Sequence, residues 1–148
     1  MIESSADSSG PATAVAFRWP VRVYYEDTDA AGVVFYANYL KFLERARTEW
    51  LRSLGFEQTT LLHDHGVVFV VRALAIDYLR PARFNDLLEV TVELSAARGG
   101  LIEVVQRVTR GTAVLVTATV KVACVNTRHF RPVRIPAPIL EKLGMRHS

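Results

Sequence analysis

The chain has 148 residues, half of them hydrophobic, which predicts one ordinary domain with a substantial core. Eighteen Lys and Arg stand against fifteen Asp and Glu. The formal charge of +3 is too small to indicate a nucleic-acid-binding protein, although it suits a small polyanionic ligand.

The N-terminal residues, the length of the apolar runs and the single cysteine indicate the cellular compartment. Residues 1–15 lack the basic start and apolar stretch of a signal peptide, and they are predicted to be a disordered tail. No apolar run approaches the roughly 18 residues that cross a bilayer. Cys124 is the only cysteine, so an internal disulfide and a cysteine-based zinc site are excluded. Together these features predict a cytoplasmic protein that contains a buried thiol.

A strand and a helix are predicted in the first part of the domain. Apolar and polar residues alternate over Phe17–Tyr25, with Val21, Val23 and Tyr25 on one face. The polar and small passage Glu26–Gly32 follows, and a helix is expected over about Asn38–Leu54, ended by Gly55. The predicted buried stripe of this helix has helical spacing and consists of Tyr39, Phe42, Leu43, Ala46, Trp50 and Leu54.

The remainder of the chain is predicted to be rich in strands. After a short helical turn at Thr60–His65, four apolar or alternating segments read as strands: Val67–Leu79, Leu87–Ser95, Leu101–Thr109 and Thr112–Val125. Arg98-Gly99-Gly100 is a turn signal between two of them. These elements predict an α+β fold in which a curved antiparallel sheet of about five strands wraps around one long helix. Because such a sheet has open edges, pairing with a second copy is expected.

The domain boundaries follow from these elements. Residues 16–132 form the predicted domain, and residues 133–148 an irregular C-terminal segment with two prolines near its start. A short helical turn is expected near Ile139–Leu143 within that segment.

The densest group of polar residues lies between the first strand and the helix. Asp27 and Asp29 are followed by Gly32 and then by an apolar run. A helix start offers unpaired backbone N–H groups, which stabilise an oxyanion, and a nearby carboxylate can attack a carbonyl or deprotonate water. The same spacing also fits a simple turn or helix cap. It fits a metal-binding Asp-x-Asp as well, although no third ligand is evident.

Several segments resemble one family. Phe17–Tyr39 closely resembles the Tol–Pal-associated acyl-CoA thioesterases of the 4-hydroxybenzoyl-CoA thioesterase family, which are hotdog proteins. The resemblance continues through Glu44–Glu49, Phe69–Arg72 and Tyr78–Arg83, and covers roughly Phe17 to Pro132. Its specific signature is Asp-x-Asp-x-x-Gly-x-Val-x-(Tyr/His)-x-x-Tyr.

This resemblance implies a fold, an activity and roles for residues. It implies a hotdog thioesterase in which Asp29 is the catalytic carboxylate, either as a nucleophile that forms a mixed anhydride or as a general base. The backbone N–H of Tyr36 would polarise the thioester carbonyl. Many Tol–Pal-associated members carry a histidine at this position. Substrate binding is assigned to Gly32, Asn38, Arg98 and Gly99, with the two turn residues near the phosphates of CoA.

The resemblance also implies an assembly, and it leaves other functions open. A homo-oligomer is expected, a dimer or a homotetramer, in which one subunit's helix and the neighbour's sheet frame an acyl tunnel. No bound cofactor or metal is required, and the acyl donor is acyl-CoA or an acyl carrier protein. The alternatives are a noncatalytic acyl-binding hotdog protein, an envelope or cell-division adaptor and, more remotely, a hotdog dehydratase. His63 and His65 lack a further ligand at metal-binding spacing.

Overall fold

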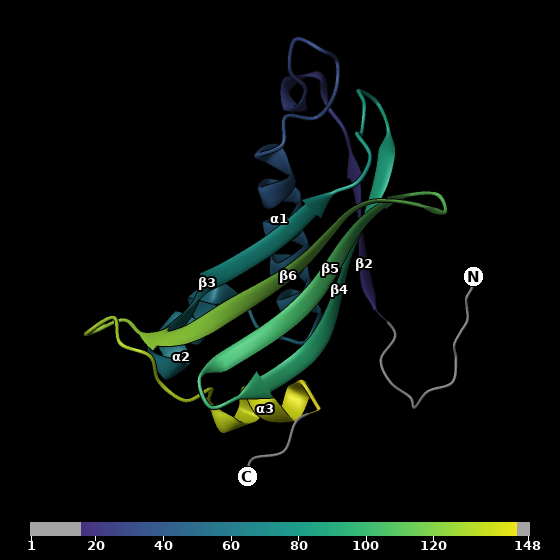
Figure 1. Cartoon of the computed structure of the whole chain (residues 1–148). Helices are drawn as coiled ribbons and strands as arrows, with labels where there is room; N and C mark the ends of the chain where they lie inside the picture. The colour runs from purple at the N-terminus through teal and green to yellow at the C-terminus, as the bar shows by residue number, and fades with distance from the viewer. Residues whose placement is uncertain (1–15, 145–148) are drawn as a thin grey trace.

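A five-stranded sheet and one long helix make up most of the molecule (Figure 1). The computed structural model describes residues 16–144, and the predicted tail 1–15 and residues 145–148 lie outside the described part. The elements in chain order are β2 (Phe17–Arg22), η1 (Tyr25–Asp27), α1 (Asn38–Ser53), α2 (Gln58–His65), β3 (Val67–Tyr78), β4 (Leu87–Arg98), β5 (Leu101–Arg110), β6 (Ala113–Asn126) and α3 (Ala137–Lys142).

The sheet is antiparallel throughout, with strand order β2-β4-β5-β6-β3. Tight turns join β4 to β5 and β5 to β6, as the turn residues predicted. β3 has only β6 as a neighbour and therefore forms a long edge. α1 lies across one face of the curved sheet (Figure 1). The predicted α+β class, with a hotdog sheet around a central helix, is confirmed.

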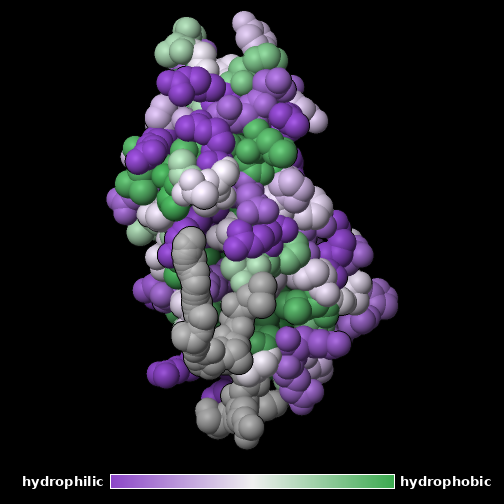
Figure 2. All heavy atoms as spheres, turned by 90° about the vertical axis from the view of Figure 1, so that its right-hand side faces the viewer, coloured by the Kyte–Doolittle hydropathy of each residue, from purple (hydrophilic) through white to green (hydrophobic). Residues whose placement is uncertain are grey.

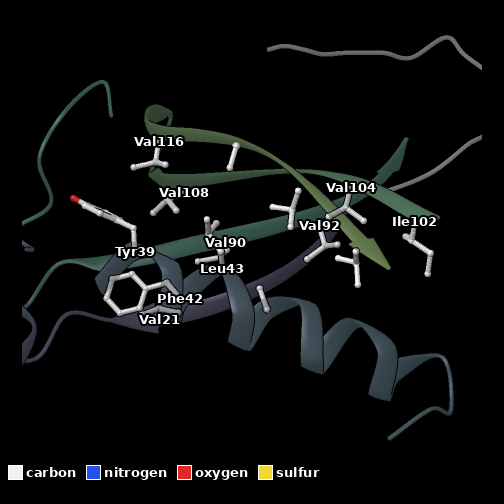
Figure 3. Packing of buried hydrophobic residues seen from close by; sticks show 14 of the residues in the cluster. Val21, Tyr39, Phe42, Leu43, Val90, Val92, Ile102, Val104, Val108 and Val116 are labelled. Carbon is white, nitrogen blue, oxygen red and sulfur yellow. The ribbon is translucent and has the colours of Figure 1, made fainter. Parts of the chain in front are cut away.

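The core lies between α1 and the sheet, where buried side chains from both point toward each other (Figure 3). Leu43 and Ala46 of α1 are fully buried, and Tyr39 and Phe42 nearly so, in agreement with the predicted stripe. Trp50 is only partly buried, as is common for so large a side chain. The sheet contributes mainly valines to this core: Val90, Val92, Val104, Val108, Val116 and Val120.

The first strand is shorter than predicted. It ends at Arg22, because the Asp27 carboxylate accepts a hydrogen bond from the Tyr24 N–H at 2.8 Å and closes the η1 turn. This turn rotates Tyr25 away from the face shared by Val21 and Val23, and Tyr25 is 79% exposed. The prediction that Tyr25 shares a strand face with Val21 and Val23 is therefore wrong.

The segment after β6 is packed onto the sheet. The N–H of Ile135 donates to the Gly99 carbonyl at 2.8 Å, and a Cβ on Gly100 would lie 2.2 Å from the Val133 oxygen. Ile139 and Leu140 of α3 are buried. The paired glycines of the β4–β5 turn thus allow the C-terminal segment to approach closely.

Figure 2 shows the hydropathy of one side of the molecule. Hydrophilic groups are spread over most of that side, interrupted by smaller hydrophobic patches. Within residues 16–144, no helix is long and apolar enough to span a membrane.

Candidate active site

The loop between η1 and α1 folds into a short ribbon that carries the predicted catalytic residues. Thr28 bridges Val34, and the Asp29 N–H donates to the Val33 carbonyl at 2.9 Å. The chain reverses at Asp29–Gly32, where the Gly32 N–H donates to the Asp29 carbonyl at 2.9 Å. Gly32 has φ +80°, a left-handed conformation that favours glycine, which agrees with its predicted conformational role.

The Asp29 side chain lies on the surface of this turn. One carboxylate oxygen accepts a hydrogen bond from the Ala31 N–H at 2.9 Å, which fixes the direction of the side chain. Within the described part of the chain, no hydrogen bond or ion pair engages the other oxygen. The carboxylate is therefore oriented by the backbone and still has an oxygen available for chemistry.

Tyr36 presents an unpaired backbone donor. Its carbonyl accepts hydrogen bonds from the Tyr78 hydroxyl at 3.2 Å and from the Tyr39 N–H at 3.3 Å. Among residues 16–144, no acceptor lies within hydrogen-bonding distance of the Tyr36 N–H. Burial, assisted by the neighbouring Tyr36, raises the pKa of Tyr78, so its hydroxyl keeps its proton at neutral pH. The carbonyl side of Tyr36 is fixed and its N–H side is open.

The start of α1 differs in detail from the sequence prediction. The N–H groups of Asn38, Tyr39 and Leu40 are not free, because they donate to the carbonyls of residues 35, 36 and 37. The unpaired donors belong instead to Tyr36 and Ala37, immediately before the helix. Ala37 makes no side-chain cap. The anion-stabilising position is thus displaced by one or two residues from the helix itself.

Asn38 and Asp27 hold the ribbon in place. The Asn38 side-chain amide donates to the Asp27 carbonyl at 3.0 Å, and the Phe35 N–H donates to the same oxygen at 3.0 Å. Asp27 therefore fixes the loop, as predicted. The amide donor of Asn38, assigned to substrate binding, is used inside the protein in this arrangement.

The loop after β3 supports the ribbon from the other side. The Val34 N–H donates to the Ala82 carbonyl at 2.8 Å, and the Ala82 N–H donates to the Tyr39 hydroxyl at 3.0 Å. Burial raises the pKa of Tyr39, which keeps this hydroxyl neutral. A hollow of about 250 Å³ lies beside Tyr36, between Tyr39, Tyr78 and Pro81. Its surface is mainly apolar, and Tyr36 forms part of its wall.

The predicted site residues do not all meet in one protomer. The Asp29 N–H pairs with the Val33 carbonyl at the turn of the ribbon. Tyr36 follows three residues after Val33. Arg98 and Gly99 form the β4–β5 turn at the opposite end of the sheet. The ten residues of β5 separate the two ends by roughly 33 Å. Within one protomer, this turn is therefore remote from Asp29, and the Gly99 carbonyl is bound by Ile135.

The described residues contain no cluster of three or more His, Cys, Asp or Glu that could hold a metal ion. His63 and His65 are exposed on α2, and the His63 ring lies 3.0 Å from the Asp64 carboxylate. Cys124 is buried, and burial raises its pKa to about 11, so the thiol is unreactive at neutral pH.

Sequence reasoning missed Arg47. This residue is not part of the predicted buried stripe of α1, but it lines a cavity of about 310 Å³ between α1 and the sheet. We call it the α1–sheet cavity. Its apolar walls include Trp50, Leu51, Phe69, Ile102, Val104 and Val122. The available signal was the spacing of Leu43, Arg47 and Leu51, which places Arg47 one turn from two buried leucines.

Comparisons with known proteins agree on one family. The family model described as Thioesterase superfamily matches residues 31–117 and begins two residues after Asp29. The acyl-CoA thioesterase YbgC of Haemophilus influenzae is 54% identical over 83% of this chain and 90% of its own length. The acyl-CoA thioester hydrolase YbgC of Escherichia coli is 46% identical, covering 84% and 92%. A crystal structure of a probable thioesterase from Bartonella henselae superposes with a TM-score of 0.78 at 38% identity, covering 82% of this chain and all of that one.

Proposed function

The chain belongs to the thioesterase superfamily of hotdog proteins, and from this premise we propose that it is an acyl-CoA thioester hydrolase with Asp29 as its catalytic carboxylate. The observation that carries this proposal is local. An oriented, exposed carboxylate lies on the same short ribbon as a backbone N–H that has no acceptor among the described residues. Relatives named as acyl-CoA thioesterases cover most of the chain at 46–54% identity, which supports the substrate class.

The chemistry follows one of two balanced routes. In the first, an Asp29 oxygen attacks the thioester carbon, the C–S bond breaks, and the CoA thiolate leaves while a mixed anhydride forms; water then cleaves the anhydride. In the second, Asp29 removes a proton from a water molecule as its oxygen attacks the same carbon; the C–S bond then breaks, and the departing CoA thiolate takes up the proton. The negative charge on the carbonyl oxygen is stabilised in both routes by the Tyr36 N–H.

The decisive test removes the charge of Asp29 without changing its size. We expect Asp29→Asn to lower kcat/KM by about 10²- to 10⁴-fold, the contribution typical of a positioned acid–base group, while the thermal unfolding midpoint stays close to the wild-type value. A thiol-release assay over short, long and aromatic acyl-CoAs measures this loss and identifies the preferred acyl group.

Asp27→Asn is the matched control, because Asp27 shares the loop but its carboxylate is used by the Tyr24 N–H. Wild-type turnover by a folded Asp29→Asn protein would contradict the mechanism. Absence of turnover on every CoA ester, even for the wild type, would direct the test to acyl carrier proteins. Failure there as well would favour a noncatalytic acyl-binding protein or an envelope adaptor of the Tol–Pal type.

We propose that the active form is a homo-oligomer, either a dimer or a tetramer. The twelve-residue strand β3 has an unpaired edge, and its side chains Val71, Leu74 and Tyr78 are 49%, 38% and 43% exposed. A long apolar edge strand is normally covered. In such an assembly, the Arg98–Gly99 turn of one subunit would contact CoA phosphates at the neighbour's site, since it lies far from Asp29 of its own subunit. A cytoplasmic location is compatible with the lone buried thiol of Cys124.

A further inference from the structure

Asn38, the first residue of α1, is hydrogen-bonded to both strands of the ribbon. Its side-chain amide donates to the Asp27 carbonyl at 3.0 Å, on the strand that leads to Asp29. Its backbone N–H donates to the Phe35 carbonyl at 2.8 Å, on the strand that leads to Tyr36. One residue at the start of a helix therefore joins the segment of the proposed carboxylate to the segment of the proposed backbone donor.

The bond to Phe35 sets the direction of the Tyr36 N–H. The Phe35 carbonyl and the Tyr36 N–H belong to one peptide group, which is planar and trans, so they point in opposite directions. Because this carbonyl accepts the Asn38 N–H, the Tyr36 N–H is directed away from the start of α1. A carbonyl that accepts a hydrogen bond also polarises its own peptide group, which makes the N–H a stronger donor.

The bond to Asp27 ties the other strand of the ribbon to the helix. The Asp27 carbonyl accepts two hydrogen bonds, each at 3.0 Å, from the Phe35 N–H and from the Asn38 amide. The first bond joins the two strands to each other, and the second joins them to α1. Asp27 and Asn38 are half-buried, whereas Asp29, two residues further along, is exposed. Without the Asn38 amide, the strand that carries Asp29 would lose this direct bond to the helix.

We propose that Asn38 is a positioning residue for the thioesterase reaction, which sets the separation of the Asp29 carboxylate and the Tyr36 N–H without itself contacting the substrate. This inference rests on the proposed function. The carboxylate acts at the carbon and the N–H acts at the oxygen of one carbonyl group, so a small change in their separation slows the reaction. The sequence assigned Asn38 to substrate binding. The two roles differ in kinetics, because a binding residue changes affinity and a positioning residue changes turnover.

The first test removes the Asn38 amide and keeps a side chain of similar size. Asn38→Leu retains the backbone N–H but cannot donate to the Asp27 carbonyl. We expect kcat to fall about ten- to a hundredfold, while the Kd for an S-alkyl-CoA, in which CH₂ replaces the thioester carbonyl, stays within about twofold of the wild-type value. An unchanged kcat, or a weaker Kd that accounts for the loss, would overturn the inference. If Asn38→Leu does not fold, Asn38→Asp suits the first turn of a helix, lacks the donor and should show at least the same fall in kcat.

A double-mutant cycle separates positioning from a general loss of structure. In the Asp29→Asn background, Asn38→Leu should lower the residual kcat less than about threefold, because no carboxylate is left to be misplaced. Equal losses in the two backgrounds would contradict the positioning role. Asn126→Leu is the matched control, since the Asn126 amide oxygen accepts the His129 N–H at 2.8 Å and fixes a loop beside the start of β3, remote from the ribbon. Its kcat should stay within about twofold of the wild-type value.

Hydrogen exchange gives a readout that does not depend on hydrolysis. The Phe35 amide shares the Asp27 oxygen with Asn38, so it should exchange roughly tenfold faster in Asn38→Leu and at the wild-type rate in Asn126→Leu. Unchanged exchange at Phe35 would overturn the inference even if the protein hydrolyses acyl-CoA. Failure of the thioesterase function is a different result, because it appears as wild-type turnover in Asp29→Asn or as no turnover in the wild type.

Discussion

At Tyr36 the backbone N–H, and not the side chain, is the group that we propose for catalysis. The carbonyl is bound by Tyr78 and Tyr39, and the N–H is unpaired within the described residues. The phenol makes no hydrogen bond through its own hydroxyl in this part of the chain. The resemblance implies that relatives with histidine at this position keep the same backbone donor, so the identity of the side chain is secondary.

This arrangement predicts opposite outcomes for two substitutions at position 36. Tyr36→Phe keeps the N–H and should stay within about threefold of wild-type kcat, whereas Tyr36→Pro removes it and should lose about 10²- to 10³-fold. Ala37→Pro is the control, since the Ala37 N–H also lacks an acceptor and φ −69° already suits proline. Steady-state kinetics measures kcat, and circular dichroism checks that each variant is folded. Equal losses of kcat in Tyr36→Pro and Ala37→Pro would contradict the role of the Tyr36 N–H as the specific donor.

Gly32 has a conformation that the turn beneath Asp29 requires. An added Cβ would meet no atom within 4 Å, so the cost of Gly32→Ala comes from φ +80° alone and should be about 1–2 kcal/mol of unfolding free energy. Because the turn carries Asp29, turnover should also fall, by about ten- to a hundredfold. Gly55→Ala is the control, because Gly55 has a similar left-handed conformation, φ +94°, beyond the far end of α1. Gly55→Ala should lower the unfolding free energy by a similar amount in urea unfolding without lowering kcat. If Gly55→Ala also lowers kcat, the effect of Gly32→Ala on turnover comes only from the loss of stability.

At the scale of elements, β3 is a long strand with no neighbour along one edge among the described strands. Its backbone pairs with β6 on one side only, and its bulge between Val71 and Ala73 interrupts the register. The side chains that face the α1 side of the sheet toward the end of the strand are only partly covered. An apolar surface next to an open edge is the feature expected of a subunit interface.

A charge placed in this surface should prevent self-association. Leu74→Lys introduces an ammonium that would be buried by a partner, so the variant should elute at about the 16.5 kDa of one chain, whereas the wild type elutes at twice that mass or more. Leu62→Lys is the control, because Leu62 is 46% exposed and belongs to α2, not to the open edge strand β3. Light scattering after size exclusion measures both, and an unchanged mass for Leu74→Lys would place the interface elsewhere.

At the scale of the whole molecule, one ion pair joins the loop after β3 to the end of β5. The Asp86 carboxylate accepts a hydrogen bond from the Arg110 guanidinium and another from the Arg83 N–H, each at 2.8 Å. Burial alone would raise the pKa of Asp86, but these hydrogen bonds outweigh it and lower the pKa below its ordinary value of 3.8. A carboxyl with a lowered pKa in the folded state stabilises the protein above its unfolded pKa.

The contribution of Asp86 to stability should therefore be complete above about pH 4 and be lost as the pH falls through the lower, folded pKa. Asp86→Asn should reduce the unfolding free energy at pH 7 and flatten its decline between pH 4 and pH 2. Urea unfolding across this range measures both effects. Arg110→Met should likewise flatten the decline of the unfolding free energy between pH 4 and pH 2. If the wild type and both variants show parallel curves of unfolding free energy against pH, the ion pair does not act through Asp86.

The sequence by itself predicted most of the elements and the segment that carries the proposed catalytic carboxylate. Alternation and turn residues predicted the three hairpin-linked strands, and the spacing of Tyr39, Phe42, Leu43 and Ala46 predicted the buried face of α1. These features are local, because side-chain period and turn chemistry depend on near neighbours in the chain. The Asp29 signature is also contiguous in sequence, so it could be recognised without a fold.

Only the tertiary structure decided which distant groups meet. Gln106, 59 residues beyond Arg47, holds that arginine at the α1–sheet cavity. The direction of the strands placed Arg98 and Asp29 at opposite ends of the sheet. Neither the contact between Gln106 and Arg47 nor the separation of Arg98 from Asp29 has a local signal, because each depends on how strands and helix pack after the chain has folded back on itself.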